Sequence, residues 1–439
     1  MNRYERYKDS GIPWLGEVPE HWIIMPIKFS LAMPITDGPH ETPEILSDGV
    51  PFISAEAVKN DKLDFNKKRG YISEEDNARF SRKYSPQKGD IYMVKSGATT
   101  GNVAKVETDE VFNIWSPLAV MRPNKNRIST DFLFYAIKSD YFNTSVQLKW
   151  NMGTQQNIGM GILSNIRVVV PPTDEQTAIT HYLDTKLGEI DALIDKQQTL
   201  LEKLAEQRTA VITHAVTKGL NPAAPMKKSG VEWLGDVPAH WDIKHSNQIF
   251  KIHNGATPKT SEPDYWGDEI VWFTPKDLGD NQNKEISTSL KMITKEGYEN
   301  CGVSLAPAKS IALSKRAPIG HLAITLLPAV VNQGCFLLEV LAPNDVNYLY
   351  YWLYANKTTL NSFGQGSTFM ELPREKFAML KISTPPKAEQ TSIAEYLDQE
   401  TAKIDRLCET VNQTIGRLKE YRTALITQAV TGKIKVTDE

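Results

Sequence analysis

The sequence predicts two similar modules that mix α-helices and β-strands (α/β, or α+β), separated by two long antiparallel helices in a pseudo-twofold arrangement. Three observations predict this fold class. A tandem duplication runs through the 439 residues, each copy contains a long stretch with coiled-coil spacing, and the intervening blocks are rich in strand-forming residues. At about 150 residues per domain, the length suits two or three domains.

Two blocks of sequence occur twice in the chain. Ser10–Trp22, SGIPWLGEVPEHW, recurs as SGVEWLGDVPAHW at Ser229–Trp241, an offset of 219. Pro171–Thr217 recurs at Pro385–Thr431 with an offset of 214, and 22 of its 47 positions are identical. The change of offset confines length differences to the blocks between these repeats. A duplication on this scale predicts two structural units of the same kind.

The blocks between the repeats, 23–170 and 242–384, keep only faint correspondences. These pair Pro51–Ser54 with Val271–Thr274 and Ser96–Gly101 with Lys315–Gly320. We expect the two blocks to share a fold while differing in most surface residues. That pattern suits two related modules that each recognise a different target. The alternative is an old duplication whose loops merely drifted.

Each of these blocks contains three strand-like segments and one short amphipathic helix pattern. The expected strands are Asp90–Val94, Asn102–Val106 and Ile166–Val170 in the first block, and Ser310–Leu313, Leu322–Leu326 and Cys335–Val340 in the second. The expected helices are Thr130–Ser139 and Asp345–Ala355. Mixed, strand-rich modules follow from this pattern.

The repeated segments that begin at Pro171 and Pro385 have apolar residues at alternating steps of four and three. A 3.5-residue period sustained this long predicts a coiled-coil seam. Its apolar members are Ile179, Leu183, Ile190, Leu193, Leu200, Leu204 and Val211, and Ile393, Leu397, Ile404, Leu407, Leu418 and Leu425. A globular block between the segments returns the chain, so we expect antiparallel pairing. The alternative is that each helix packs only on its own module.

The ends of both long helices carry recognisable signals. In the first copy, Thr173 follows two prolines and precedes Gln176 by three residues, which predicts a capping box. Lys387 replaces Thr173 in the second copy, so that cap is weaker. Gly219 and Gly432 predict where the helices stop. At 1.5 Å per residue, helices of ~43 residues extend roughly 65 Å.

Charge and cysteine content exclude several classes of protein. The formal net charge is −3, with −5 on the two helix segments and +2 on the rest, so no general basic coat exists. Three cysteines rule out a disulfide scaffold, and none has zinc-site spacing. The cysteine content therefore predicts a cytoplasmic protein with no metal site. We expect no signal peptide, because the first ten residues are polar and charged, and no membrane partner, because the apolar runs are short.

A search for catalytic motifs finds none. The chain has no P-loop, no methyltransferase Asn/Asp-Pro-Pro-aromatic motif with a glycine-rich cofactor turn, and no HExxH or metal-nuclease spacing. His21 and His240 are repeated beside Trp22 and Trp241, where a packing role is the better interpretation. We therefore predict no catalytic residue.

Polar, glycine-punctuated turns are the remaining candidates for a binding site. Ser, Thr, Asn and Lys can contact phosphates or base edges, Arg suits guanine, and paired amides suit adenine. The candidates in the first block are Lys59, Lys67, Lys68, Arg69, Lys95, Ser96, Thr99, Thr100, Asn102, Gln155, Gln156 and Asn157. Those in the second are Lys276, Ser314, Lys315, Arg316, Ser367 and Thr368. Each turn taken alone is as readily a surface loop.

With these repeats laid out, the chain resembles the specificity subunits of type I restriction–modification systems over its whole length. The strongest match is the helix motif in the second copy: Pro385-Pro386, Glu389-Gln390, Ile393, Tyr396-Leu397-Asp398, Ile404-Asp405, Arg422–Ile426 and Ala429–Gly432. The resemblance implies two target-recognition domains, each reading one half of a split, asymmetric DNA site. It also implies no catalysis in this chain, and no cofactor bound to it.

The resemblance further implies partners. Two adenine methyltransferase subunits, which use S-adenosylmethionine, would assemble on this chain with double-stranded DNA. Restriction subunits, motor nucleases that use ATP and magnesium, would join through them. Once the seam is used, the outer helix faces keep charged and repeated residues such as Arg208 and Arg422. A duplicated surface predicts two copies of one partner, each bound by an equivalent face.

The predicted organisation is an N-terminal repeat segment, a first recognition domain, a first long helix, a linker with the second repeat segment, a second recognition domain, and a second long helix with its tail. These segments are 1–22, 23–170, 171–219, 220–241, 242–384 and 385–439. Two other readings stay open: a fused nuclease–methylase, and a coiled-coil scaffold presenting two protein-binding modules without DNA.

Overall fold

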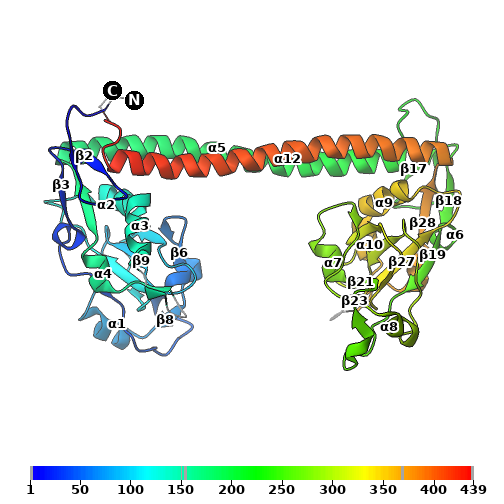
Figure 1. Ribbon diagram of the computed structural model, residues 1–439, viewed down its shortest axis with the longest axis horizontal. Helices are drawn as coiled ribbons and strands as arrows, with labels where there is room; N and C mark the ends of the chain where they lie inside the picture. The colour runs from blue at the N-terminus through cyan, green and yellow to red at the C-terminus, as the bar shows by residue number, and fades with distance from the viewer. Residues whose placement is uncertain (1–2, 150, 153–155, 367–369, 437–439) are drawn as a thin grey trace. The chain divides into compact units, whose positions relative to one another are not determined.

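The computed structural model describes residues 3–149, 151–152, 156–366 and 370–436. Its contacts divide the chain into two compact units (Figure 1). Unit 1 is Met1–Gln197 with Asn412–Glu439, and unit 2 is Gln198–Val411. Each unit therefore contains one α/β module and about one half of each long helix.

The two long helices form where the heptad spacing predicts them. Helix α5 spans Thr173–Lys218 and helix α12 spans Lys387–Val430. Gly219 and Gly432 follow their ends with φ of 74° and 69°, in the left-handed region that glycine tolerates. Within each unit the start of one helix lies beside the end of the other, so the pairing is antiparallel (Figure 1).

The repeated tryptophan segments hold these helix ends together. In unit 1, Trp22 is fully buried, its Nε1 donates to Glu175 at 3.0 Å, and it packs beside Gly432. In unit 2, Trp241 is fully buried and donates to Glu389 at 3.1 Å. Each tryptophan follows a pair of short strands. The pairs are β1 (Tyr7–Asp9) with β2 (Glu17–Pro19), and β16 (Met226–Lys228) with β17 (Asp236–Pro238).

The histidines beside these tryptophans bind the same carboxylates. His21 Nε2 lies 2.5 Å from Glu175, and His240 Nε2 lies 2.7 Å from Glu389. The predicted packing role fits these contacts, because each histidine joins a repeat segment to the first turn of a long helix.

The buried face of the helices differs from the predicted seam at three of its thirteen apolar positions. The buried or half-buried positions that keep the seam spacing are Leu183, Leu187, Ile190, Ile194, Gln197, Leu201, Leu204, Arg208, Val211 and Ala215 in α5, and Leu397, Thr401, Ile404, Cys408, Val411, Ile415, Leu418, Arg422, Leu425 and Ala429 in α12. Ile179 and Ile393 are also buried. Leu193, Leu200 and Leu407 are 46%, 41% and 52% exposed, which corrects their assignment to the seam.

The physical reason for this correction is the width of the apolar face. A heptad repeat places two seam positions in every seven residues. The second position can lie either three or four residues after the first. Apolar residues occur at both places, for example Leu193 beside Ile194 and Leu200 beside Leu201. Packing against the module and the other helix selects the later position, and the earlier one is left on the surface.

Two seam positions carry arginines that bridge the helices. Arg422 Nε lies 3.0 Å from Asp191 in unit 1, and Arg208 forms the same pair with Asp405 in unit 2. Both arginines and both aspartates are related by the offset of 214. The expectation that Arg208 and Arg422 belong to a free outer surface is therefore wrong. They are part of the helix–helix contact.

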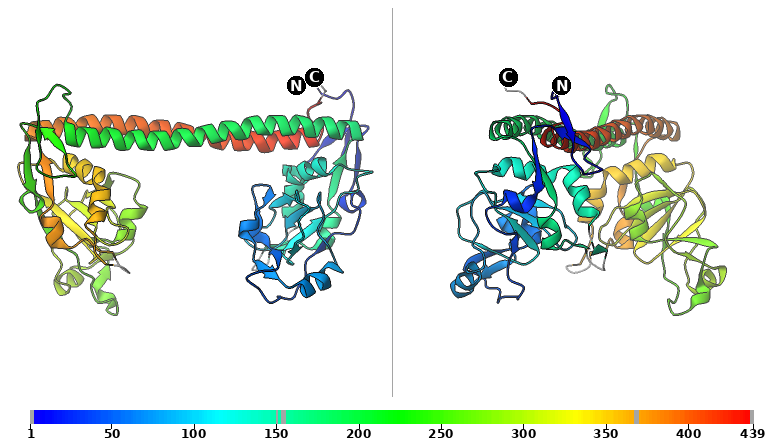
Figure 2. Two further views of the ribbon diagram at one scale, coloured as in Figure 1. Left: turned by 180° about the vertical axis from the view of Figure 1, so that it is seen from behind. Right: turned by 60° about the vertical axis from the view of Figure 1, so that its left-hand side comes forward.

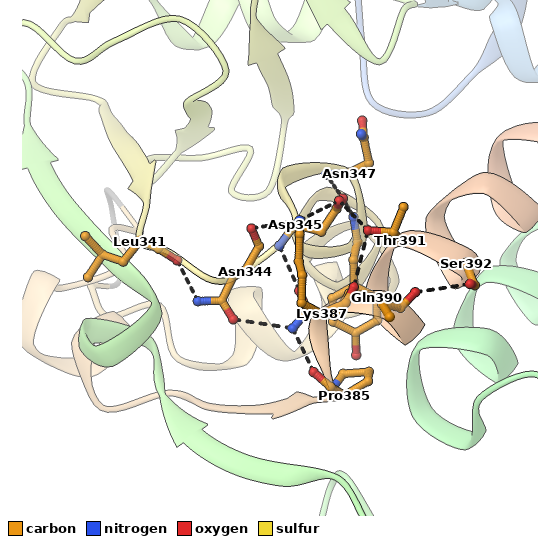
Figure 3. Close-up of polar contacts among 11 residues, drawn as sticks. Leu341, Asn344, Asp345, Asn347, Pro385, Lys387, Gln390, Thr391 and Ser392 are labelled. Atoms are coloured by element: carbon orange, nitrogen blue, oxygen red, sulfur yellow. Dashed lines mark hydrogen bonds and ion pairs between the residues drawn. The ribbon is translucent and has the colours of Figure 1, made fainter.

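The first turn of each long helix is tied to its module by a glutamine. Gln390 Nε2 donates to Pro385 O at 2.9 Å, and its Oε1 accepts from Asp345 N at 2.8 Å (Figure 3). Gln176 makes the equivalent bonds to Pro171 O at 2.9 Å and from Ser129 N at 2.7 Å. The capping box predicted for Gln176 is thus wrong, because its amide reaches the loop before helix α2 instead of closing back on the helix.

Module 1 is built on two sheets. The four-stranded sheet has the order β10-β9-β12-β4, and the three-stranded sheet has the order β11-β5-β8. The strands are β4 (Thr36–Asp37), β5 (Val50–Ile53), β8 (Gly70–Ile72), β9 (Ile91–Val94), β10 (Val103–Lys105), β11 (Asn113–Ile114) and β12 (Leu118–Met121). β5 and β11 are parallel, whereas β9 is antiparallel to both its neighbours.

Module 2 repeats this plan with one further strand in each sheet. The orders are β19-β27-β24-β25-β22 and β20-β23-β21-β26. The strands are β19 (Phe250–Asn254), β20 (Trp266–Gly267), β21 (Ile270–Phe273), β22 (Glu285–Ile286), β23 (Met292–Ile293), β24 (Ile311–Ser314), β25 (Leu322–Thr325), β26 (Ala329–Val331) and β27 (Cys335–Val340). β21 and β26 are parallel, as β5 and β11 are.

Helices connect each large sheet to the helix pair (Figures 1 and 2). They are α2 (Thr130–Lys138) and α3 (Asp140–Gln147) in unit 1, and α9 (Val346–Ala355) and α10 (Lys357–Ser362) in unit 2. In unit 1 one hydrophobic core joins this layer to β9, β12 and both long helices, and unit 2 has its own equivalent core. Each unit therefore has an independent hydrophobic core.

The remaining elements are short. They are β3 (Ile23–Pro26) with β15 (Arg167–Val170), β18 (Asp242–His245) with β28 (Lys381–Thr384), β6 (Val58–Lys59) with β7 (Lys62–Leu63), and β13 (Asn151–Met152) with β14 (Gln156–Asn157). Short helices are η1 (Ile27–Ser30), η2 (Ala55–Ala57), η3 (Phe65–Lys67), α1 (Glu74–Ser81), α4 (Met160–Ser164), α6 (Ser246–Ile249), η4 (Pro263–Tyr265), α7 (Pro275–Asp280), α8 (Lys295–Asn300) and α11 (Arg374–Ala378).

The predicted fold class is confirmed: two similar modules of mixed α/β structure accompany two long antiparallel helices. The strands expected in both blocks form within about a residue of their predicted bounds, as β9, β10, β15, β24, β25 and β27. The two faint correspondences between the blocks are also confirmed, since β5 matches β21 and the loop after β9 matches the loop after β24.

Candidate nucleic-acid interface

Several loops of module 1 meet at one edge of its sheets. Lys95 N donates to Pro117 O and Ile158 N donates to Lys95 O, both at 2.8 Å. Ser96 forms a β-bridge with Asn157. The loop after β9, the turn before β12 and the β13–β14 hairpin are thereby held together. The structure thus brings together the predicted turn Lys95–Asn102 and the predicted amide cluster that includes Asn157.

Module 2 has the same convergence with different side chains. Lys315 N donates to Gly334 O at 2.8 Å, and Leu372 N donates to Lys315 O at 2.7 Å. Arg316 forms a β-bridge with Glu371. The loop after β24, the turn before β27 and the segment that reaches Glu371 occupy the places of their module 1 counterparts. We call these two loop clusters interface 1 and interface 2.

A buried carboxylate organises the cations of interface 1. Asp37 is fully buried and lies 2.5 Å from Lys83, 3.0 Å from Lys95 and 2.9 Å from His40. Burial raises the pKa of the Asp37 carboxyl, but the hydrogen bonds from the two lysines outweigh burial and hold the pKa below its ordinary value. Two lysines share one carboxylate, so the cluster keeps a surplus positive charge.

Glu371 has the same role in interface 2. Its carboxylate lies 2.8 Å from Lys315 Nζ and 2.9 Å from Arg316 Nε. The hydrogen bond from Lys315, together with that from Arg316, holds the pKa of Glu371 below its ordinary value. Arg316 remains 46% exposed, so its charge faces solvent while its Nε is fixed. A guanidinium held in this way suits planar, bidentate contact with a base edge or a phosphate.

We expect the network around Asp37 to make unit 1 sensitive to acid. Because the folded-state pKa is depressed, the ionised carboxylate stabilises the fold above its unfolded-state pKa of about 4, and this contribution is lost as the pH falls through the folded-state pKa. Urea unfolding followed by hydrogen exchange in unit 1 at pH 7, 5 and 3 measures it. Asp37→Asn should be less stable than the parent at pH 7 and lose less stability in acid. Equal acid sensitivity in both proteins would contradict this prediction.

The other candidates of module 1 are divided between interface 1 and other surfaces. Thr99 and Asn102 are exposed in the loop after β9, and Thr100 Oγ1 donates to Gly97 O at 2.6 Å. Arg69 stacks on Trp115, which lies in the turn before β12, and its Cζ is 3.9 Å from the ring centroid. Gln156 lies in β14, whereas Gln155 is outside the described residues.

The basic residues before Arg69 lie further from this loop cluster. Lys67 is exposed in a short helical turn, and Lys68 Nζ donates to Phe65 O at 3.2 Å. Lys59 belongs to the β6–β7 hairpin, whose Asp61 carbonyl accepts from Lys105 N at the far end of β10 from Asn102. The structure therefore does not bring Lys59 to interface 1.

In module 2 one candidate needs correction. Ser314 is fully buried, and its hydroxyl donates to Pro318 O at 2.8 Å and accepts from His321 N at 2.9 Å. It shapes the turn and cannot contact DNA without unfolding it. Lys276 is exposed near the start of α7, beside the turn before β27. Ser367 and Thr368 lie outside the described residues.

Sequence reasoning missed the carboxylates Asp37 and Glu371 and the residues of the turns before β12 and β27. Those turns carry Trp115 in module 1 and Asn332 in module 2. One signal could have located them. Asp37-Gly38 and Asn254-Gly255 are equivalent pairs, and a Cβ on either glycine would lie about 2 Å from a backbone oxygen of these turns.

Among the residues that the structure describes, no group of three or more His, Cys, Asp or Glu side chains is placed to hold a metal ion. Within the same residues, no helix is both long and apolar enough to cross a membrane.

Comparison with known proteins gives a consistent picture. A family model described as type I restriction modification DNA specificity domain matches residues 39–203 and 238–417. The putative type I restriction enzyme MjaX specificity subunit of Methanocaldococcus jannaschii is 25% identical over 445 residues, covering 98% of this chain and 97% of that protein. The MjaIX specificity subunit of the same organism is 36% identical over 170 residues, 37% of this chain and 38% of that protein.

Solved structures show the same fold. A chain reported in a study of complex assembly and conformational transition of the type I R-M system has a TM-score of 0.71 at 18% identity, covering 95% of this chain and 99% of that one. The HsdS subunit from Thermoanaerobacter tengcongensis has a TM-score of 0.53 at 17% identity, covering 95% of this chain and 98% of that one.

Proposed function

The chain belongs to the type I restriction–modification DNA specificity family, as a non-catalytic specificity subunit, and we propose that each of its two modules reads one half of a bipartite, asymmetric DNA site. The observation that carries this proposal is the contrast between repeated scaffold contacts and unlike interfaces. Trp22 and Trp241 make the same contacts in both units, whereas Trp115 is replaced by Asn332 at equivalent turns. Unlike residues at equivalent interface positions support the reading of two different half-sites.

The chemistry of each interface suits one half of a DNA site. Interface 1 combines Lys83, Lys95 and His40 around one carboxylate, with the Arg69–Trp115 stack beside them. Interface 2 presents Arg316 with its Nε fixed. Surplus positive charge supports phosphate contact, and oriented Arg and amide groups support base readout.

A binding-site selection experiment tests this function. The full-length chain, with its methyltransferase partner, is incubated with a random duplex library and the bound fraction is sequenced. We expect two short blocks of fixed sequence separated by an unspecified spacer of constant length. A single block of sequence, or no preference at all, would refute bipartite readout.

We further propose that the helix pair docks two adenine methyltransferase subunits on equivalent surfaces. Leu193 and Leu407 are related by the repeat and are exposed. Tyr182 and Tyr396 precede them by 11 residues, or about three helical turns on the same face. Leu193, Leu407 and Tyr396 are exposed, whereas Tyr182 is half-buried against the unit 1 core. Large exposed side chains repeated in this way suit a protein partner. These partners would supply S-adenosylmethionine chemistry, and the restriction subunits that join them would use ATP and magnesium, in the cytoplasm.

Replacing Leu407 by Lys should weaken the binding of one methyltransferase subunit about tenfold and leave the other in place. The reason is that an exposed apolar contact at the centre of one docking surface is replaced by a charge. Native mass spectrometry at increasing partner concentration should show the 1:1 complex persisting where the parent forms 1:2. Ala402→Lys, on an exposed position about 140° around the same helix, is the control. A single partner bound to the parent at saturation would contradict the two-surface arrangement.

A further inference from the structure

A pocket of about 740 Å³ lies in unit 2 between the module and the helix pair. The loop from α7 to β22 forms one wall and contributes Lys284, and Tyr350 and Lys357 line the wall formed by α9 and α10. His321, at the start of β25, and Arg208 of α5 complete it. The pocket is large enough for a sugar–phosphate unit.

In the described part of the chain, two of the four basic side chains of this pocket have a carboxylate partner, and two do not. Arg208 is paired with Asp405, and Lys284 lies 2.5 Å from Asp398. No carboxylate of the described residues pairs with His321 or Lys357. Burial, and then the charge of Lys357, lower the pKa of His321. Two basic side chains therefore face each other without an acid between them, an arrangement that an anion would relieve.

The equivalent place in unit 1 is smaller and acidic. Its cavity is only about 290 Å³ and is lined by five carboxylates and four cationic side chains. Asp61 of the β6–β7 hairpin reaches Arg422 at 3.3 Å and also pairs with Lys138. The backbone oxygens of Asp61 and Lys284 accept equivalent hydrogen bonds from β10 and β25, so a lysine stands in unit 2 where unit 1 has this carboxylate. The difference shows that the basic pocket is not a by-product of the shared fold.

Two chain segments reach both the pocket and interface 2. The loop that carries Lys315 and Arg316 at its beginning carries His321 at its end. Helix α7 also reaches both places. Its first residue, Pro275, lies near Gly334 of interface 2, and Asn281, which follows its last turn, lines the pocket. A strand whose bases are read by interface 2 can therefore continue into the pocket.

We propose that this pocket binds a phosphodiester of the DNA backbone beside the half-site read by module 2. The inference rests on the proposed function and deepens it. Lys357 and His321 would contact the phosphate. The contact reads no base, so it anchors module 2 on any sequence. The smaller, acidic cavity of unit 1 makes no such contact.

The test compares Lys357→Ala and His321→Ala with Lys62→Ala, an exposed lysine that lines the unit 1 cavity. Affinity of the full-length chain with its methyltransferase partner is measured on target and random duplexes between 50 and 200 mM salt. Lys357→Ala should weaken binding to both duplexes by a similar factor and reduce the slope of log K against log salt by about 0.9. Its preference among single-base variants should not change. His321→Ala should weaken both duplexes equally, and Lys62→Ala should match the parent.

The outcomes separate this inference from the proposed function. If the parent binds duplex specifically and both pocket variants equal it in affinity and salt slope, the phosphodiester contact is wrong while the proposed function stands. If Lys357→Ala loses discrimination at bases, the pocket reads sequence and the inference is also wrong. Inorganic phosphate that binds the parent but does not compete with DNA would likewise overturn it. Failure of the parent to prefer any sequence would instead refute the proposed function.

Discussion

Trp22→Ala is expected to lower the free energy of unfolding of unit 1 by ~3–5 kcal/mol and to leave unit 2 close to its original stability. Trp22 is fully buried within the core that joins module 1 to both long helices. Removing the indole leaves a cavity and takes away the Nε1 donor of Glu175. Because a large buried side chain is lost with a hydrogen bond, the effect should lie at the upper end for a single substitution.

Hydrogen exchange measured by mass spectrometry in increasing urea distinguishes the units. Amides of β9, β12 and α2 should lose protection at lower urea in Trp22→Ala, while those of β24, β27 and α9 should not. Trp241→Ala should give the reverse result, because its core contains none of the unit 1 strands. Trp22→Phe keeps most of the buried volume and should cost less than Trp22→Ala. Equal loss of protection in both units would show that the cores unfold together.

The sequence predicts the scaffold well because the scaffold is repeated and local. A duplicated block, an alternation of four and three, and short runs of β-branched residues each leave a periodic trace. The long helices, the strands β9, β10, β24 and β25, and both stop glycines follow from such traces. What periodicity does not decide is which of two adjacent apolar stripes is buried. Leu193 and Ile194 are equally apolar, and only packing in three dimensions selects Ile194.

The interfaces are harder to predict because their decisive contacts join residues far apart in the chain. Glu371 lies 55 residues beyond Arg316, and Lys83 lies 46 residues beyond Asp37. No motif or fixed spacing announces such pairs. A Lys or Arg in a turn has the same appearance in sequence whether it is free, as Lys276 is among the described residues, or held by a carboxylate. Residue chemistry could therefore locate Lys95 and Arg316, but it could not show that both are already paired.

This pairing sharpens what Arg316 is expected to do. Its Nε is engaged by Glu371 at 2.9 Å, which fixes the plane of the guanidinium and leaves its terminal nitrogens directed to other partners. An oriented guanidinium loses little side-chain entropy on binding and can donate two parallel hydrogen bonds to guanine. Arg316→Ala should therefore reduce discrimination in one half-site by ~1–3 kcal/mol, which is about 5- to 150-fold in relative affinity, and leave the other half-site unchanged.

Glu371→Gln separates base reading from simple attraction to phosphate. This variant keeps the charge of Arg316 but replaces the carboxylate that orients it, so discrimination at the same half-site should fall while affinity for random duplex stays equal or rises. If Arg316 only contacts phosphate, Arg316→Ala should weaken all duplexes alike, and Glu371→Gln should strengthen them without changing base preference. Affinities for all single-base variants of both half-sites, measured with Arg69→Ala as the module 1 counterpart, decide between these results. Loss of discrimination in both half-sites, or none in either, would show that the loop after β24 does not read bases.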